Sequence, residues 1–103
     1  MTDDRELLEL AAKADGRTLR YNSIGTQDAR CAWNPLDDDG DALRLAVKLR
    51  MDITFDTIDV FAFPPDGRCG CSESLNVDDP CAATRRAIVR AAAEIGLSMQ
   101  DED

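Results

Sequence analysis

The sequence predicts an α+β fold in which three helices pack around a small antiparallel sheet. Two kinds of apolar periodicity alternate along its 103 residues: helical spacing near both ends and in the middle, and strand-like alternation in between. The short connections between the strands favour antiparallel pairing, and the expected order is αββαββ(β)α. Because a chain of this length builds one hydrophobic core, we expect residues 1–103 to form a single domain.

The first helix is expected from about Asp3 to Asp15. Asp3 can cap its start, Glu6 three residues later completes a capping box, and Gly16 suits the left-handed residue after a helix end. The apolar residues of this segment repeat on one side only. This helix should therefore pack by one face.

Residues 18–24 and 28–33 are typical of two strands joined by a short turn. The apolar residues of the second strand, Ala29, Cys31 and Trp33, alternate with mostly polar neighbours. This is the period of a strand with one buried face. We expect a hairpin with one side in water and Trp33 in the core.

The middle helix, expected over residues 41–51, is the most apolar element of the chain. A narrow polar strip runs along it at helical spacing. The strip consists of Asp41, Arg44, Lys48 and Asp52. The remaining positions, among them Leu43, Leu45 and Val47, are apolar. Because such a helix has to be covered on more than one side, we expect it to be the central helix of the domain.

Ile53 and Phe55 predict a short third strand, and residues 58–63 a fourth that is apolar on both faces except at one aspartate. A single bent strand with a bulge is an alternative interpretation of the two segments. The run of proline, aspartate and glycine at 64–67 predicts a turn. It could lead into an edge strand near residues 68–73.

The last helix should begin after Asp79, which can cap it, with Pro80 in the first helical position, where the missing N–H is harmless. Most of its apolar residues fall on one face. Charged residues follow one another at four-residue spacing on the other face, at Arg86, Arg90 and Glu94.

The chain is strongly acidic, with 21 acidic and 12 basic residues and a formal charge of -9. Contacts with phosphate backbones and anionic lipid headgroups come mainly from Lys and Arg, so we expect no direct nucleic-acid binding and no membrane binding. The first residues are charged and are not followed by the apolar run of a secretion signal, and no stretch is apolar enough to span a bilayer. These features predict a cytoplasmic location.

No motif points to catalysis, and we expect no enzyme activity, no cofactor and no metal. There is no histidine, no phosphate-binding glycine loop and no C-x-x-C pair. Zinc could in principle use Cys69 and Cys71 together with Cys31 and Cys81, but their spacing is irregular. Free thiols are favoured, with Cys31 and Cys81 on expected core faces, and a redox pair at 69 and 71 is a further alternative.

The acidic run from Asp37 to Asp41 has the composition of a calcium loop. Pro35 and Ala46 stand where such a loop needs acidic ligands. Negative charge at the start of a helix meets the positive end of the helix dipole. Helix capping therefore explains this run without a metal.

Three segments of the chain resemble a known family. They are Trp33-Asn-Pro-Leu with Asp39-Gly-Asp-Ala-Leu-Arg-Leu-Ala-Val-Lys-Leu, Asp79-Pro with Ala82-Ala-Thr-Arg-Arg-Ala-Ile-Val-Arg-Ala-Ala-Ala-Glu-Ile-Gly96, and Glu6-Leu-Leu-Glu-Leu-Ala-Ala-Lys13. These segments are similar to the phage ABA sandwich domain family, small proteins of unknown function that phages and prophages encode. The resemblance covers all three expected helices and implies an α-β-α sandwich, with helices on both sides of the sheet. Residues 53–76 carry none of it, and a member-specific function could reside there.

Small size, the missing catalytic groups, the phage resemblance and the acidic charge together predict a non-catalytic phage or prophage accessory protein. It would bind a host or phage protein in the bacterial cytoplasm, for example as an inhibitor of host defence such as an anti-CRISPR, by occupying a nucleic-acid-binding groove of its partner. The candidate contacts are Asp37, Asp38, Asp56, Asp59, Asp66, Asp78 and Asp79.

Other readings of the same features stay open. The acidic charge could serve solubility alone. A structural or self-assembling phage protein is the main alternative, and it could form a homodimer through the apolar segment 60–63. An enzyme is a third.

Overall fold

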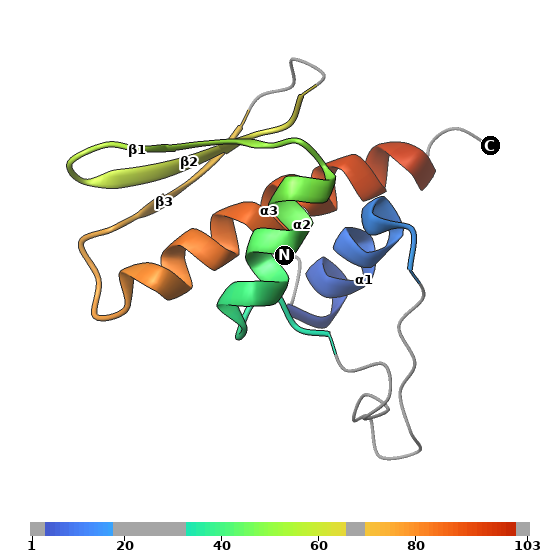
Figure 1. The fold of residues 1–103 in the computed structure, drawn as a ribbon, viewed down its shortest axis with the longest axis horizontal. Coiled ribbons are helices and arrows are strands. Elements are labelled where there is room, and N and C mark those ends of the chain that lie inside the picture. The colour runs from blue at the N-terminus through green and yellow to red at the C-terminus, as the bar shows by residue number, and fades with distance from the viewer. Residues whose placement is uncertain (1–3, 18–32, 66–69, 101–103) are drawn as a thin grey trace.

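The computed structural model describes residues 4–17, 33–65 and 70–100 of the chain (Figure 1). Its elements are α1 (Asp4–Asp15), α2 (Asp39–Lys48), β1 (Asp52–Phe55), β2 (Asp59–Phe63), β3 (Cys71–Ser74) and α3 (Pro80–Gln100). Three helices and a three-stranded antiparallel sheet confirm the α+β class. The strands expected at 18–24 and 28–33 lie outside the described residues except for Trp33, which is buried but not in a strand.

The sheet is a meander in the order β1-β2-β3. Ile53 of β1 lies opposite Ala62 of β2, which in turn lies opposite Cys71 of β3. A tight turn, in which the Asp56 N–H donates to the Asp59 carbonyl at 2.7 Å, separates β1 from β2. The two-strand interpretation of residues 53–63 is therefore confirmed over the single bent strand.

The helix ends follow the signals in the sequence. The carboxylate of Asp38 accepts the N–H of Asp41 at 2.7 Å, and that of Asp79 accepts the N–H of Ala82 at 3.1 Å. Gly16, directly after α1, has a φ of +82°, a conformation that side chains disfavour. Local capping chemistry thus places the starts of α2 and α3 and the end of α1.

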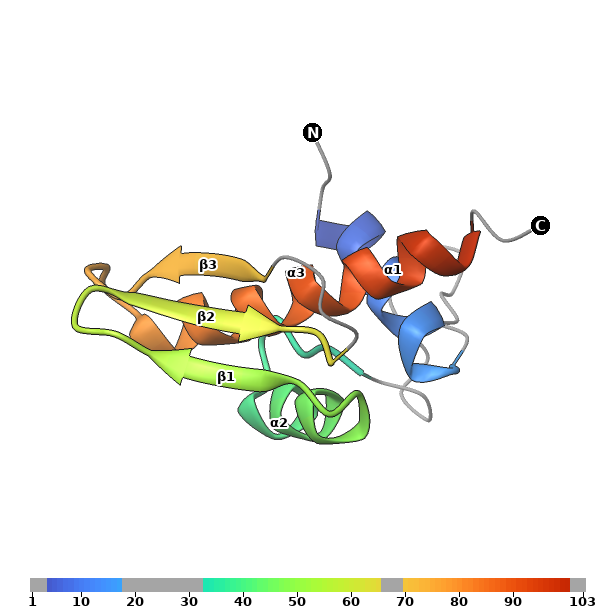
Figure 2. The same cartoon turned by 90° about the horizontal axis from the view of Figure 1, so that it is seen from above.

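The central helix is α3, and the prediction that the middle helix has this place is wrong. In Figures 1 and 2, α3 runs under the sheet, and α1 and α2 pack against its other sides. Ala87 and Ala91 of α3 form one buried cluster, whose other members are Val60 and Ala62 of β2. A second buried cluster joins α3 to α1, α2 and Trp33. It contains Leu7, Leu8, Ala11, Ala12, Trp33, Ala42, Leu45, Ala46, Ile88, Val89, Ala92 and Ala93.

Only one face of α2 is buried. Leu45 is 1% exposed, whereas Leu43 is 64% and Val47 63% exposed. The physical reason lies in side-chain size. The alanines of α3 let neighbouring elements approach its backbone from several directions, so α3 fills the centre.

The described helices gather on one side of the sheet, which differs from the layering that the family resemblance implies (Figures 1 and 2). The face of the sheet toward α3 is buried at Val60 and Ala62. On the opposite face, Thr54, Phe61 and Ser72 stand in register across the three strands. This face has no described helix on it.

Polar contacts join α1 to α2 and α3. The carboxylate of Asp15 is almost fully buried, accepts a hydrogen bond from Arg17 Nε at 2.6 Å and lies 3.5 Å from Lys48 Nζ. At the other end of α1, Asp4 forms an ion pair with Arg86 of α3 at 3.0 Å. These contacts fix both ends of α1.

Candidate functional site

The segment before α2 is held by a hydrogen-bonded corner. The carboxylate of Asp41 accepts the N–H of Asn34 at 3.0 Å and a hydrogen bond from Arg44 at 2.7 Å. Asn34 also accepts the N–H of Leu36 through its side chain. Burial raises the pKa of Asp41, but the bond from Asn34 and the bond and charge of Arg44 outweigh this effect, so the pKa lies below its ordinary value.

Asp41→Asn should therefore destabilise the domain at neutral pH and much less in acid. Because the folded-state pKa of Asp41 is lowered, its stabilisation is fully present above the ordinary pKa and is lost as the pH falls through the folded-state value. We expect a loss of about 1 kcal/mol at pH 7, since the asparagine keeps an acceptor but not the charge. Urea denaturation between pH 7 and pH 2 measures the difference. A constant difference over this range would contradict the assignment.

Arg85 connects the starts of α2 and α3. Its Nε donates to the Leu36 carbonyl at 2.7 Å, and its Nη1 donates to Asp39 at 2.5 Å. A further ion pair places Asp79 at 3.7 Å. The hydrogen bond from Arg85 to Asp39 raises the pKa of the guanidinium, which stays charged. The two helix starts are thus held at a fixed separation.

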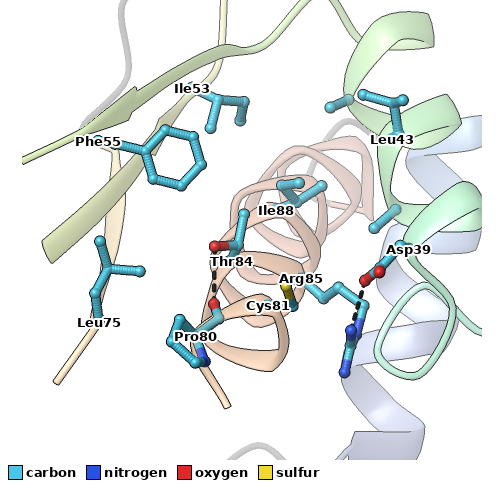
Figure 3. A pocket seen from close by; sticks show the side chains of 12 residues that line it. Asp39, Leu43, Ile53, Phe55, Leu75, Pro80, Cys81, Thr84, Arg85 and Ile88 are labelled. Atoms are coloured by element: carbon cyan, nitrogen blue, oxygen red, sulfur yellow. Dashed lines mark hydrogen bonds and ion pairs between the residues drawn. The ribbon is translucent and has the colours of Figure 1, made fainter. Parts of the chain in front are cut away.

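Between α2 and β1, above α3, lies an open apolar groove of about 580 Å³ (Figure 3). Figure 3 shows Leu43 and Asp39 of α2 on one wall and Ile53, Phe55 and Leu75 on the other. The floor is the first part of α3, with Pro80, Cys81, Thr84, Arg85 and Ile88. We call this feature the α2–β1 groove. Its volume lies within the roughly 300–1,000 Å³ of ordinary ligand sites.

The polar side chains of the α2–β1 groove bond to groups of the protein itself. Thr84 donates its hydroxyl to the Pro80 carbonyl at 2.9 Å, and Arg85 and Asp39 bond to each other. The surface left open is mainly carbon, including Leu43 and Phe55, which is 61% exposed. Such a surface favours apolar side chains over a ligand that needs directional hydrogen bonds.

Three of the candidate aspartates lie next to residues that line one end of this groove. The turn after β1 and the loop after β3 touch there, because the Leu75 N–H donates to the Ile58 carbonyl at 2.8 Å. Asp59 begins β2 and shares the open face of the sheet with Phe61, away from the groove. Asp56 follows the lining residue Phe55 in the turn, and Asp78 and Asp79 precede the lining residue Pro80 in the loop. We call this the acidic end of the groove.

The other candidates lie elsewhere. Asp37 and Asp38 stand before α2, where Asp37 accepts a hydrogen bond from the Asn34 side chain at 3.2 Å and Asp38 caps the helix. Asp66 lies outside the described residues. The predicted set is therefore not one surface, although all its described members except Asp59 are exposed.

The apolar members of the groove are the residues that sequence reasoning missed. Leu43 was expected to be a core residue and Phe55 a strand residue, because nothing in an apolar pattern distinguishes a side chain that packs inside from one that lines an open groove. The one available signal was the excess of apolar residues around the middle helix. A helix with more apolar surface than its neighbours can cover indicates a contact site as readily as a central position.

The apolar segment 60–63 divides between the core and the open face of the sheet. Val60 and Ala62 are fully buried against α3. Phe61 and Phe63 point to the other face, where their rings stack with centroids 6.0 Å apart and planes inclined by 12°. Of the four residues in this segment, only these two rings can contribute to an oligomer surface.

Cys71 and Cys81 are free thiols, as predicted. Cys71 is half-buried, and burial raises the pKa of its thiol. Cys81 is exposed, which corrects its expected place on a core face; it lies in the first turn of α3, on the open floor of the groove. Cys31 and Cys69 lie outside the described residues.

No metal site or membrane helix in the described part of the chain, and no related protein, assigns a function to this groove. Within residues 4–17, 33–65 and 70–100, no group of three or more His, Cys, Asp or Glu side chains is placed to hold a metal ion. None of the described helices is long and apolar enough to cross a membrane. Comparison of the chain with protein-family models, with curated proteins and with solved structures finds no match.

Proposed function

We propose that this chain is a non-catalytic accessory domain that binds another protein through the α2–β1 groove. The observation that carries the proposal is an open, carbon-lined groove beside a cluster of exposed carboxylates. Contiguous apolar surface of this kind on a small domain marks an interaction site more often than an accident of packing. The cellular setting is that of a phage or prophage protein in a bacterial host, which rests on the sequence resemblance alone.

The energetics favour a binding site that joins apolar contact with charge. Leu43 and Phe55, which both line the groove, are each more than half exposed. Covering each of them would contribute about 1 to 2 kcal/mol. Association costs at least about 4 kcal/mol in lost translational and rotational freedom. The apolar contacts therefore need support, and the acidic end can supply it by attracting a basic partner.

A protein partner suits this groove better than a small molecule does. Small-molecule sites use a few polar groups to fix the orientation of the ligand. In the α2–β1 groove, Thr84, Arg85 and Asp39 already bond to protein groups. Apolar side chains of another protein need no such directional partner.

Leu43→Glu tests the proposal, with Met99→Glu as its matched control. Both leucine and methionine are exposed, at 64% and 43%, but Met99 lies near the far end of α3. Because a carboxylate in the groove would repel an apolar segment, we expect Leu43→Glu to lower the recovery of a bound host or phage protein at least tenfold. Met99→Glu should leave recovery unchanged. Quantitative mass spectrometry of proteins captured from infected bacterial lysate measures both, with thermal unfolding as a check on the fold.

The same two variants test the host-defence role. A protein that inhibits a CRISPR system should restore plaque formation on an immune host, and Leu43→Glu should abolish the effect while Met99→Glu keeps it. A protein that restores no plaques but still captures a partner through the groove would retain the binding function and lose this particular role. Equal capture by the wild type and Leu43→Glu would remove the groove from the function altogether.

The stacked Phe61 and Phe63 rings favour a second candidate, a self-assembling structural protein. A partly exposed aromatic pair on an open sheet face can pair with its own copy. Light scattering over micromolar concentrations distinguishes the two functions. A strict monomer excludes self-assembly, and a dimer that Phe63→Lys dissociates supports it.

A further inference from the structure

We infer that the segment bound in the α2–β1 groove is an extended strand of the partner, with apolar side chains at alternate positions and basic residues at one end, which pairs with the open edge of β1. This inference rests on the proposed function and names the chemistry of the partner. It follows from the backbone of β1, the lining of the groove and the charge at its acidic end.

The strand β1 lies at one edge of the described sheet, because the strand order is β1-β2-β3. It pairs with β2 from Asp52 to Phe55, and no described backbone group bonds to its other edge. An edge of unpaired N–H and C=O groups is a template for another strand.

The opposite edge of the sheet, formed by β3, differs from that of β1. Arg90 of α3 donates to the Ser72 carbonyl at 3.0 Å and also binds Glu73. A side chain thus occupies part of that edge. Covering an edge in this way is a common protection against strand addition. The comparison singles out β1 as the edge to which a strand could add.

The groove lies beside the open edge of β1, with α3 as its floor. A strand added there would extend the sheet toward α2 and lie over the groove (Figures 2 and 3). Since alternate side chains of a strand point to opposite faces, every second residue of the added strand would enter the groove between Leu43, Phe55 and Ile88. Those positions should be apolar, and the intervening ones should face solvent.

Acidic residues lie in and beside the groove. Asp56 follows the lining residue Phe55, Asp78 and Asp79 precede the lining residue Pro80, and Asp39 is on the opposite wall. The cation beside them, Arg85, is already paired with Asp39 and Asp79. A second copy of this acidic chain would meet like charges at this end, whereas lysine or arginine would be attracted. The charge therefore favours a basic partner segment over self-association.

Synthetic peptides test the inference on the intact protein. The probe is a peptide of about seven residues with alternating valine and threonine and two lysines at one end, long enough to span the edge of β1. Its controls carry two glutamates in place of the lysines, N-methyl groups on alternate backbone amides in either of the two phases, or a helix-forming order of the same residues. NMR titration measures affinity, and alkylation of Cys81, resolved by mass spectrometry, reports cover of the groove floor.

We expect the lysine peptide to bind at least tenfold more tightly than the glutamate peptide and to slow the alkylation of Cys81. One of the two N-methyl phases should weaken binding at least tenfold, because it removes the amides that pair with β1. Asp56→Asn combined with Asp78→Asn should weaken binding several-fold. Glu6→Gln combined with Glu9→Gln, an equal change of charge on α1, should leave it unchanged.

Each contrary result overturns the inference in a different way. Equal binding of both N-methyl peptides, or tighter binding of the helix-forming peptide, excludes strand pairing, and equal binding of the glutamate peptide excludes the basic segment. Cys81 that is protected without any peptide shows that this chain covers its own groove, or that a second copy does so if protection rises with concentration. If a captured partner depends on Leu43 but no strand peptide competes with it, the proposed function stands and this inference fails.

Discussion

Gly96→Ala is expected to lower the free energy of unfolding by about 3 kcal/mol, a large effect for a single methyl group. Gly96 lies in α3 where that helix touches α1. A Cβ at this position would lie 2.0 Å from the carbonyl oxygen of Leu10 and 2.8 Å from its carbonyl carbon. Both atoms belong to the backbone, so no side-chain rotation relieves the overlap. The two helices would have to move apart.

The separation would affect the larger core cluster. Leu7, Leu8 and Ala11 of α1 pack there with Val89 and Ala93 of α3. Moving α1 outward by even a fraction of a side-chain diameter loses contacts along this whole interface, because interiors are close-packed. Replacing glycine by alanine inside a helix normally gains up to about 1 kcal/mol. The measured loss of unfolding free energy should therefore be smaller than the cost of the steric overlap alone.

Gly40→Ala is the matched control. Gly40 is also a helical glycine, but the atoms nearest to its added Cβ are side-chain atoms of Arg44 and Asp38 at 3.1 Å, which can move. We expect this variant to be neutral or slightly more stable. Urea denaturation of both variants, with the slope m compared as well as the midpoint, separates the two outcomes. If Gly96→Ala matched Gly40→Ala in stability, the close approach of α1 and α3 would be wrong.

The sequence predicted those parts of the fold that depend on local chemistry. Asp79 and the acidic run that contains Asp38 were expected to cap helices and do so, and Gly16 has the positive φ expected of a residue after a helix end. The two strands after α2 were also expected, because turn residues and alternating side chains specify them without reference to the rest of the chain.

Which helix takes the centre was not predictable in the same way. An apolar face indicates that a helix must be covered, but it does not indicate which element covers it. The central position belongs to α3, because Ala87 and Ala91 let β2 approach closely, while Val89 lies in the buried cluster with α1 and α2 on the other side. These are properties of contacts between distant segments. Periodicity along one segment does not contain them.

The candidate site was predictable only in part. The charge pattern pointed to aspartates, and three of them, Asp56, Asp78 and Asp79, neighbour residues that line one end of a groove. The groove itself comes from Leu43, Phe55 and Ile88, which belong to three different elements. No spacing in the sequence relates these residues. Chain topology alone brings them together.

Leu45→Ala is expected to cost about 3 kcal/mol, within the roughly 2–5 kcal/mol that such truncations cost in cores. Leu45 is 1% exposed and lies in the cluster that joins α2 to α3. Its removal would leave a cavity between two helices that can close only by a shift of α2. Arg85, which bonds to Asp39 and to the carbonyl of Leu36, resists that shift.

Leu43→Ala, two residues earlier on the same helix, should cost no more than about 0.5 kcal/mol. Leu43 is 64% exposed, so its truncation removes little buried area and creates no cavity. Since both variants make the same chemical change in the same helix, the intrinsic helix preference cancels between them. The difference in unfolding free energy, measured by urea denaturation, reports burial alone.

This pair also reports on the state of the α2–β1 groove in the protein by itself. If the groove is open until a partner binds, Leu43→Ala stays nearly neutral in the free protein and costs affinity in the complex. Should the free protein lose as much stability from Leu43→Ala as from Leu45→Ala, then both faces of α2 are covered already, and the groove cannot be a vacant binding site. If Leu43→Ala causes an intermediate loss of stability that grows with protein concentration, a second copy covers Leu43, since only association makes stability depend on concentration.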